Sequence, residues 1–259
     1  GTVDFNGDFY RAELTVGAGR GRLTAKAQAN LRSEAYGITA QAAQFPLNSF
    51  AKGMNLSPFT GRLRASGRGF DVMSPRTSLS AKAGIDHLVY DTYDLSGMAL
   101  GAELKGGRLN ADFSAANSWL EAKGTLAGML NRKGYDLTLL TDIPAVNLHT
   151  IGVTQDSLTI GTLADVHFRA NPSFSAMEVD GSLCRNTFTT PRMSNMAKDL
   201  LFNFSTGADT TTASVAAGDL KLQLGSKEDM GRLSSQLGAF LAELSRQAAE
   251  HELDQEKLK

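Results

Sequence analysis

The four histidines are the residues of this sequence best suited to metal binding or acid–base catalysis, and their spacing supports neither. His87, His149, His167 and His251 are far apart, none forms a short ligand pair, and no cysteine cluster accompanies them. We expect His149 to lie in a connector, His251 on the charged face of a helix, and His167 at a polar position of a strand. No metal site is predicted.

The single cysteine, Cys184, cannot form an intrachain disulfide. It stands in the run Gly181–Arg185, where nothing resembles the partner set of a catalytic nucleophile. A free cysteine in such a run is most often a small hydrophobic strand residue. We interpret Cys184 in this way.

Three acidic or glycine-rich runs have the residue types of ion-binding loops. Asp4–Asp8 and Asp91–Asp94 lack the ligand spacing and the closing glutamate of a calcium loop. Gly17–Gly21 lies between two alternating strands, and no Lys-Ser/Thr pair follows it as in a phosphate-binding loop. We interpret all three as hairpin turns. Because a Gly-x-Ser-x-Gly nucleophile elbow is also missing, we predict no enzymatic activity and no cofactor.

The charge balance argues against nucleic-acid binding. Lys and Arg number 26 and Asp and Glu number 27, so the formal net charge is −1, whereas nucleic-acid binders carry a basic excess. The sequence has no N-terminal signal and no apolar stretch of about 18 residues. It begins in strand-like sequence and ends in a charged tail. We therefore interpret it as an internal segment of a longer protein.

Apolar and polar residues alternate through most of residues 1–225. The runs 10–16 and 23–31 are among the clearest examples. Because strand side chains point alternately to opposite faces, each run has one apolar and one polar face. Such one-sided strands are typical of antiparallel sheets. The sequence therefore predicts a mainly β fold.

Glycine-rich breaks separate the predicted strands. Gly17–Gly19, Gly106–Gly107 and Gly124 occur at spacings typical of hairpin connections. Between Leu158 and Phe168 the alternation loses its phase, and a β-bulge is one explanation.

The pattern recurs with a period of about one hundred residues. Tyr36 matches Tyr135, 99 residues later, and Gly107 matches Gly207 at an offset of 100. Six further pairs hold this spacing to within two residues: Ile38 and Leu137, Pro46 and Pro144, Asn48 and Asn147, Gly53 and Gly152, Gly61 and Gly161, and Leu63 and Leu163. We predict an elongated fold with repeat units of roughly 1–53, 54–152 and 153–225 that stack side by side.

Residues 226–259 change to a helical period. Apolar residues recur there at spacings of three and four: Met230, Leu233, Leu237, Phe240, Leu241, Leu244 and Ala248. Ser226 and Asp229 form a capping-box-like start. We predict a C-terminal amphipathic α-helix that covers a sheet face or edge, or leads into a further repeat. Its polar face is not basic, which argues against a helix lying on a membrane surface.

Many inward positions of the predicted strands are alanines. Twenty positions are predicted to form an apolar, lipid-accepting face: Tyr10, Ala12, Leu14, Val16, Leu23, Ala25, Ala27, Ala29, Ile38, Ala40, Leu79, Ala81, Ala83, Ile85, Leu109, Ala111, Phe113, Leu220, Leu222 and Leu224. Rows of Ala fill the layer of about 10 Å between two packed sheets poorly. We therefore favour a sheet curled into an apolar trough over a sandwich or a plain β-solenoid.

These features resemble the TamB family of translocation and assembly module proteins, within the wider AsmA-like group. The resemblance covers essentially the whole chain and rests on the alternating strands, on the period near one hundred, and on a Tyr-x-[Ile/Leu]-Thr strand followed by a Pro-x-Asn…Gly connector, which begins at Tyr36 and again at Tyr135. It implies a taco-like antiparallel β-groove with a lipid-accepting interior. It also implies a periplasmic location in a Gram-negative bacterium, with an inner-membrane anchor outside this segment, and a role in outer-membrane biogenesis.

Two functions are expected. In the first, the groove holds the acyl chains of phospholipids in transit between the inner and outer membranes, with the rest of the same long chain as its neighbour. In the second, the segment is a structural or interaction module whose sheet edges pair with strands of an outer-membrane β-barrel protein during assembly.

Overall fold

The computed structural model describes residues 1–50, 53–228, 231–232 and 246, and 67% of the described residues lie in β-strands. The only helix with defined bounds in this part of the chain is the single 3₁₀ turn η1 (Leu47–Ser49). The prediction of a mainly β, antiparallel fold is therefore confirmed.

The strands follow one another closely along the chain. Their bounds are β1 Thr2–Asn6, β2 Phe9–Ala18, β3 Gly21–Asn30, β4 Ala35–Phe45, β5 Phe59–Arg68, β6 Ser78–His87, β7 Val89–Tyr90, β8 Tyr93–Asp94, β9 Met98–Lys105, β10 Arg108–Ala116, β11 Leu120–Asn131, β12 Gly134–Asn147, β13 Thr159–Ala170, β14 Met177–Thr189, β15 Ser194–Met196, β16 Leu200–Thr206, β17 Thr211–Ala217 and β18 Leu220–Ser226.

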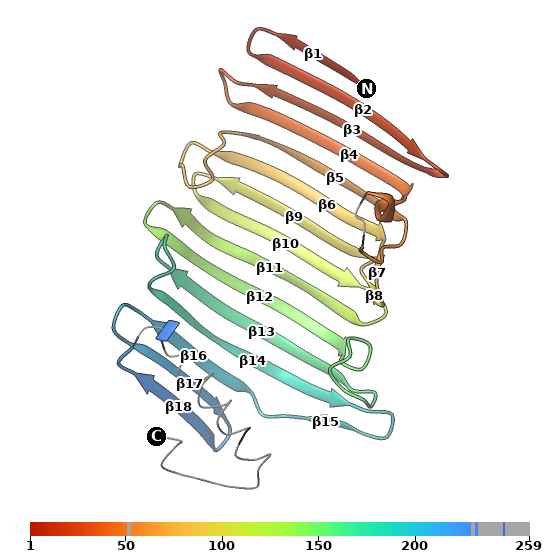
Figure 1. Cartoon of the computed structure of the whole chain (residues 1–259). Helices are drawn as coiled ribbons and strands as arrows, with labels where there is room; N and C mark the ends of the chain where they lie inside the picture. Colours follow the sequence, from red (N-terminus) through yellow and green to blue (C-terminus); the bar gives the residue numbers. More distant parts are fainter. Residues whose placement is uncertain (51–52, 229–230, 233–245, 247–259) are drawn as a thin grey trace.

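Sixteen of these strands form one open antiparallel sheet. Apart from β15, which pairs with β14, and the separate β7–β8 hairpin, the strands lie beside one another in chain order from β1 to β18 (Figure 1). Each strand is thus held by the neighbours that precede and follow it in the sequence. The described residues do not form two packed sheets, so the sandwich alternative is not the architecture of this part of the chain.

Short glycine turns connect the neighbouring strands at several hairpins. The predicted turn at Gly17–Gly21 joins β2 to β3, with Gly19 at a φ of 59°. Gly106 and Gly107 join β9 to β10 with φ values of 62° and 78°. A two-residue turn with two consecutive positive φ angles has a twist that matches the twist of the strands it joins. Glycine adopts such angles without a steric penalty.

The prediction of a break at Gly124 is wrong. Gly124 lies inside β11, directly opposite Phe113 of β10. A Cβ atom at this position would come within 2.5 Å of Cζ of the Phe113 ring. The glycine therefore makes room for a cross-strand aromatic ring, a packing requirement that a sequence pattern does not distinguish from a turn.

Register shifts explain the loss of alternation between Leu158 and Phe168. The β13–β14 pairing shifts between Gly161 and Leu163, and the β12–β13 pairing shifts between Ile143 and Val146. A similar shift occurs between Ala42 and Phe45, where β4 meets β5. These irregularities lie at the strand ends next to the long connectors, where bulges bend strands and re-aim their side chains.

The sheet is a single layer with little enclosed core. Among the described residues, the buried hydrophobic side chains are mostly alanines, and Phe45, at 4% exposure, is the largest of them. By contrast, Phe5 in β1 is 75% exposed and Leu222 in β18 is 58% exposed. Large apolar side chains are therefore left uncovered over much of the sheet.

Most of the predicted C-terminal helix (226–259) lies outside the described residues. Its proposed first residue, Ser226, closes β18, and its Oγ accepts a hydrogen bond of 3.2 Å from the backbone N–H of Glu228. The helix therefore stays a prediction. Within the described part of the chain, no helix has the length and apolarity needed to cross a bilayer.

Candidate functional site: an uncovered apolar face

The strand register joins apolar side chains into rows that cross the entire sheet. The central row takes one residue from each successive strand: Val3, Ala12, Ala27, Ile38, Ala65, Ala81, Ala102, Ala111, Leu126, Leu139, Val166, Gly181, Phe202, Val215 and Leu222. Directly paired residues share a face of the sheet. This row therefore contains no polar side chain from β1 to β18.

Rows two residues away on either side are nearly as apolar. One row runs through Phe5, Tyr10, Ala29, Tyr36, Gly67, Leu79, Leu104, Leu109, Gly128, Leu137, Phe168, Val179, Phe204, Ala213 and Leu224. The other runs through Leu14, Ala25, Ala40, Leu63, Ala83, Leu100, Phe113, Gly124, Thr141, Ala164, Leu183, Leu200, Ala217 and Leu220. We call these three rows together the apolar face.

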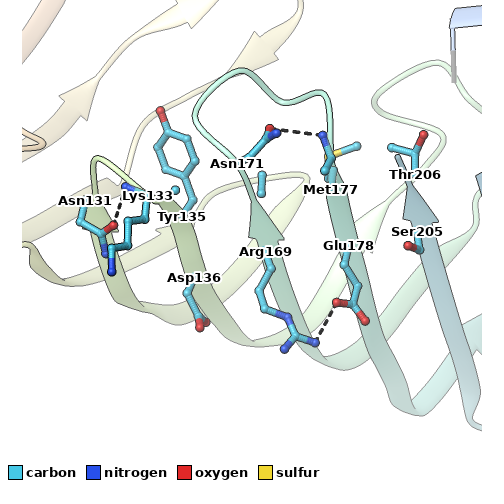
Figure 2. A pocket seen from close by; sticks show the side chains of 13 residues that line it. Asn131, Lys133, Tyr135, Asp136, Arg169, Asn171, Met177, Glu178, Ser205 and Thr206 are labelled. Carbon is cyan, nitrogen blue, oxygen red and sulfur yellow. Dashed lines mark hydrogen bonds and ion pairs between the residues drawn. The ribbon is translucent and has the colours of Figure 1, made fainter. Parts of the chain in front are cut away.

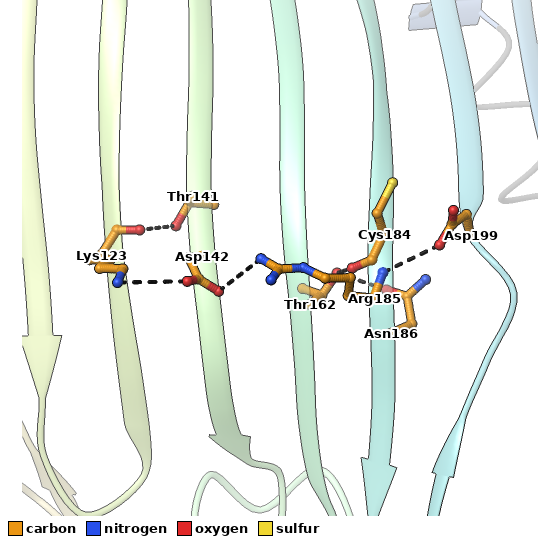
Figure 3. Close-up of polar contacts among 8 residues, drawn as sticks. All are labelled: Lys123, Thr141, Asp142, Thr162, Cys184, Arg185, Asn186 and Asp199. Atoms are coloured by element: carbon orange, nitrogen blue, oxygen red, sulfur yellow. Dashed lines mark hydrogen bonds and ion pairs between the residues drawn. The ribbon is translucent and has the colours of Figure 1, made fainter.

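Thr141 is the one aliphatic hydroxyl side chain in these two flanking rows, and its hydroxyl group has a hydrogen-bond partner within the protein. Thr141 is 7% exposed, and its Oγ1 donates a hydrogen bond of 3.1 Å to the backbone carbonyl of Lys123 (Figure 3). A buried hydroxyl is tolerated when it has such a partner. Thr141 therefore does not interrupt the apolar character of the face.

The apolar face is long and narrow. At strand spacings of about 4.8 Å, fifteen adjacent strands extend roughly 65 Å, and three alternate residues along a strand cover about 14 Å. All twenty residues predicted for the lipid-accepting face lie on this side of the sheet, in these rows or continuing them at Val16, Leu23 and Ile85. The sequence prediction missed the contributions of β1, β5, β9, β11–β14, β16 and β17. Their alternation was the available signal, but register shifts or glycines interrupt it in β5, β11, β12, β13 and β14.

Side-chain size changes along the face. In the central row, β2 to β10 supply alanine at every strand except β4, whereas β11 to β18 supply Leu, Val and Phe apart from Gly181. An apolar hollow of about 530 Å³ lies over β1–β4. It is lined by Val3, Tyr10, Ala12, Ala27, Ala29, Tyr36, Ile38 and Phe70, and by Arg11 and Gln28, whose side chains alternate to the opposite face. Small side chains leave this space open, since an alanine fills much less volume than a leucine or phenylalanine.

Aromatic residues from two loops lie over one edge of the face. Phe70, in the β5–β6 loop, stacks on Tyr36 with ring centroids 5.6 Å apart. Phe174, in the β13–β14 loop, stacks on Tyr135 at 5.0 Å and contacts Phe168 at 6.4 Å. Stacked rings at these distances stabilise the loop positions beyond simple burial. Both loops thus place an aromatic ring over the margin of the apolar face.

The β5–β6 loop also spans several strands. Oδ2 of Asp71 lies 3.1 Å from Nη2 of Arg132, in the turn between β11 and β12. In a flat sheet these two connections would be separated by four strand spacings, or roughly 19 Å. At the opposite ends of the strands, the Tyr93 hydroxyl lies 3.5 Å from the carbonyl oxygen of Ile151, again across four strand spacings. Connectors at both ends of the strands therefore bridge strands that are not neighbours in the sheet.

The Asp71–Arg132 contact makes the β5–β6 loop sensitive to one substitution. We expect Arg132→Gln to lower the hydrogen-exchange protection of amides 70–76 severalfold, because the loop loses its ion pair to the β11–β12 turn, while β5 and β6 keep their ladder bonds. Lys133→Gln, in the same turn, removes a charge with no carboxylate partner among the described residues and is the matched control. Equal protection in both variants would contradict this assignment.

The same contact should respond to acid. The hydrogen bond from Arg132, together with the one from the backbone N–H of Met73, lowers the pKa of Asp71. A lowered pKa in the folded state means that the contact is intact above the usual carboxyl pKa of about 4 and is lost as the pH falls through the lowered value. Protection factors of amides 70–76 should therefore fall in that range, and the fall should be smaller in Arg132→Gln, in which Asp71 keeps only the hydrogen bond from Met73.

The reverse face of the sheet is polar and charged. Nζ of Lys123 and a guanidinium nitrogen of Arg185 lie 3.8 and 3.7 Å from the two carboxylate oxygens of Asp142 (Figure 3). The Cys184 thiol points away from this network. His167 lies at a polar strand position, as predicted, with Nε2 2.7 Å from Oδ1 of Asp136. These contacts are cross-strand pairs between exposed and half-buried groups at the surface, which contribute little each.

The other sequence candidates for chemistry lie apart from one another. His149 is in the β12–β13 connector and His251 lies outside the described residues. Asp91, at a φ of 55°, occupies the β7–β8 turn, and the hydrogen bonds from Ser96 lower the pKa of Asp94 at the end of β8. No group of three or more His, Cys, Asp or Glu side chains in the described residues could hold a metal ion.

The apolar face is thus the most extended chemical feature of the described chain. Searches against protein-family models, curated proteins and solved structures returned no match for this sequence.

Proposed function

We propose that this chain is a non-catalytic lipid-handling segment, whose apolar face accommodates phospholipid acyl chains on their way between the inner and outer membranes of a Gram-negative envelope. The observation that carries the proposal is the central apolar row, which continues through fifteen strands and in which every residue is exposed or only half-buried. Exposed apolar patches of this extent mark interaction sites for lipid or protein.

The physical basis is burial of methylene groups without a specific site. Each CH₂ group removed from water contributes about 0.8 kcal/mol. A continuous apolar face lets an acyl chain lie at many positions along the sheet, which suits passage better than a closed pocket does. Headgroups would stay at the polar margins, where the loops around Asp71 and Asn171 carry hydrogen-bonding side chains.

We further propose that the sheet curves into a groove built from repeats of about one hundred residues, with the predicted helix at 226–259 flanking or plugging it. The groove is supported by the connectors at both ends of the strands, which reach across four strand spacings. Supporting the repeat, Tyr36 and Tyr135 each begin a strand, each is stacked on a phenylalanine from the loop after the following strand, and each of these strands has a register shift near its end.

Lipid content tests the proposed function directly. Protein purified from envelopes without detergent should yield phospholipid on organic extraction and mass spectrometry. The delipidated protein should then accelerate transfer of labelled phospholipid between vesicles. Protein that carries no lipid and transfers none would overturn the proposal.

A second function is favoured by the open sheet edges. β1 pairs only with β2, and β18 only with β17 among the described strands, so each has a free row of backbone groups that could pair with a β-barrel strand. A peptide that copies an outer-membrane β-strand should then protect amides of β1 or β18 from hydrogen exchange. Unchanged exchange at both edges would exclude this alternative.

A further inference from the structure

The polar face of β2–β5 contains a hollow of about 540 Å³, on the side of the sheet opposite to the apolar face. We call it the cationic hollow. Its polar side chains come from two adjacent cross-strand ladders. One ladder pairs Glu13 with Lys26, Lys26 with Thr39, and Thr39 with Arg64; the other brings in Arg11 and Gln28.

A glycine helps to form the depression. Gly37 of β4 lies between Gln28 of β3 and Ser66 of β5 in the second ladder. It has no side chain to fill the space, and Nε2 of Gln28 comes within 3.3 Å of the position that a Cβ atom would take. The Gln28 amide is therefore available at the floor of the hollow.

The charges in the hollow do not balance. Glu13 is its one carboxylate, and that side chain already serves two cations: Arg11 at 3.6 Å and Lys26 at 3.2 Å. Arg64 has no carboxylate within ion-pair distance among the described residues. With three cations and one anion, the hollow carries an excess of two positive charges.

Neighbouring strands add to this excess. Arg62 is the next residue on the same face of β5 as Arg64, and Lys82 of β6, which also borders the adjoining hollow over β6–β11, pairs directly with Arg64. Like charges placed side by side repel one another. A sheet keeps such an arrangement at a cost in stability, which a bound anion would offset.

Two other polar hollows show that this excess is not a general property of the sheet. The hollow near the β12–β14 end has two cations and two carboxylates, and its Arg169 is paired with Glu178 at 2.9 Å (Figure 2). The hollow over β6–β11 contains Lys82 with Glu103 and Asp112, so carboxylates predominate there.

We propose that the cationic hollow binds a phosphate group. Arginine guanidinium groups match phosphate oxygens with paired N–H donors, and lysine adds a compact positive charge. Arg64, Arg11 and Lys26 supply these groups, and the Gln28 amide and Thr39 hydroxyl add neutral donors. The phosphate comes either from a free anion or from an anionic lipid headgroup at a membrane surface, since both present the same chemistry.

The test uses two phosphate sources and the whole chain. Inorganic phosphate is titrated by calorimetry, and vesicles of phosphatidylglycerol or of phosphatidylcholine are tested by co-sedimentation. Binding to inorganic phosphate identifies a free anion as sufficient. Binding to phosphatidylglycerol vesicles alone identifies phosphate presented at an anionic surface. In either case we expect Arg64→Gln to weaken binding about tenfold or more, which corresponds to the loss of charge-assisted hydrogen bonds.

A control variant distinguishes phosphate binding in the cationic hollow from attraction to positive charge anywhere on the polar face. Lys221→Gln removes one positive charge from an exposed position of the same face on β18, far from the hollow, and should leave binding unchanged. Ala111→Asp on the apolar face should also retain phosphate binding, so failure of the lipid proposal and failure of this one are distinguishable. The inference is overturned if neither source binds, or if Lys221→Gln weakens binding as much as Arg64→Gln in variants with equal melting temperatures.

Discussion

Replacing Ala111 by Asp should reduce co-purified phospholipid and vesicle-to-vesicle transfer at least tenfold while the protein stays folded. Ala111 lies in the central row of the apolar face, paired with Ala102 on one side and Leu126 on the other. An acyl chain lying over this position would cover the new carboxylate, and an unpaired carboxylate that is removed from water costs several kcal/mol. The chain is therefore excluded from that part of the face.

Asn110→Asp is the matched control for this prediction. Asn110 is the preceding residue in β10 and is exposed on the opposite face, so this variant changes the net charge by the same amount one position away. It should carry and transfer lipid like the unmodified chain. If both variants lose lipid equally, net charge rather than the apolar face governs the activity. If neither does, the face does not carry acyl chains.

Gly124→Ala should lower the free energy of unfolding by about 1–3 kcal/mol, the cost of an overpacked interior position. The added methyl group would lie 2.5 Å from Cζ of Phe113 and 2.7 Å from the backbone oxygen of Leu140. The Phe113 ring can avoid the methyl group only by leaving its position over residue 124. The Leu140 carbonyl belongs to the β12 backbone, so it can move only together with that strand. Both responses disturb the β10–β12 pairing in the middle of the sheet.

The control for Gly124→Ala is the same substitution at Gly84 in β6. The nearest atom to a Cβ at Gly84 is Nε of Arg62, at 3.7 Å, which is an ordinary contact. Because glycine inside a strand is about 0.5–1 kcal/mol less favourable than alanine, Gly84→Ala should leave stability unchanged or raise it slightly. Urea unfolding midpoints measure both. Equal midpoints for the two variants would show that the Phe113 ring does not depend on the space at Gly124.

The sequence was sufficient to predict a mainly β fold, several turns, and the apolar side of the strands whose alternation is unbroken. The alternation in residues 10–16 and 23–31 depends only on the two-residue period of an extended chain. The turns at Gly19 and at Gly106–Gly107 depend only on local backbone angles. These are properties of a few consecutive residues, so no knowledge of distant contacts is needed to read them.

Tertiary structure decided how the strands are aligned and which surfaces remain open. Gly124 looks like a break in the sequence because the ring that occupies its space belongs to Phe113, on another strand. The Asp71–Arg132 contact joins residues 61 positions apart, and the cationic hollow exists because register places Lys26 and Arg64 on either side of Thr39. Alternation specifies which face a side chain occupies, but only the pairing between strands determines its neighbours. The apolar pattern was therefore visible in the sequence, whereas the continuous face and the charge excess behind it were products of the register.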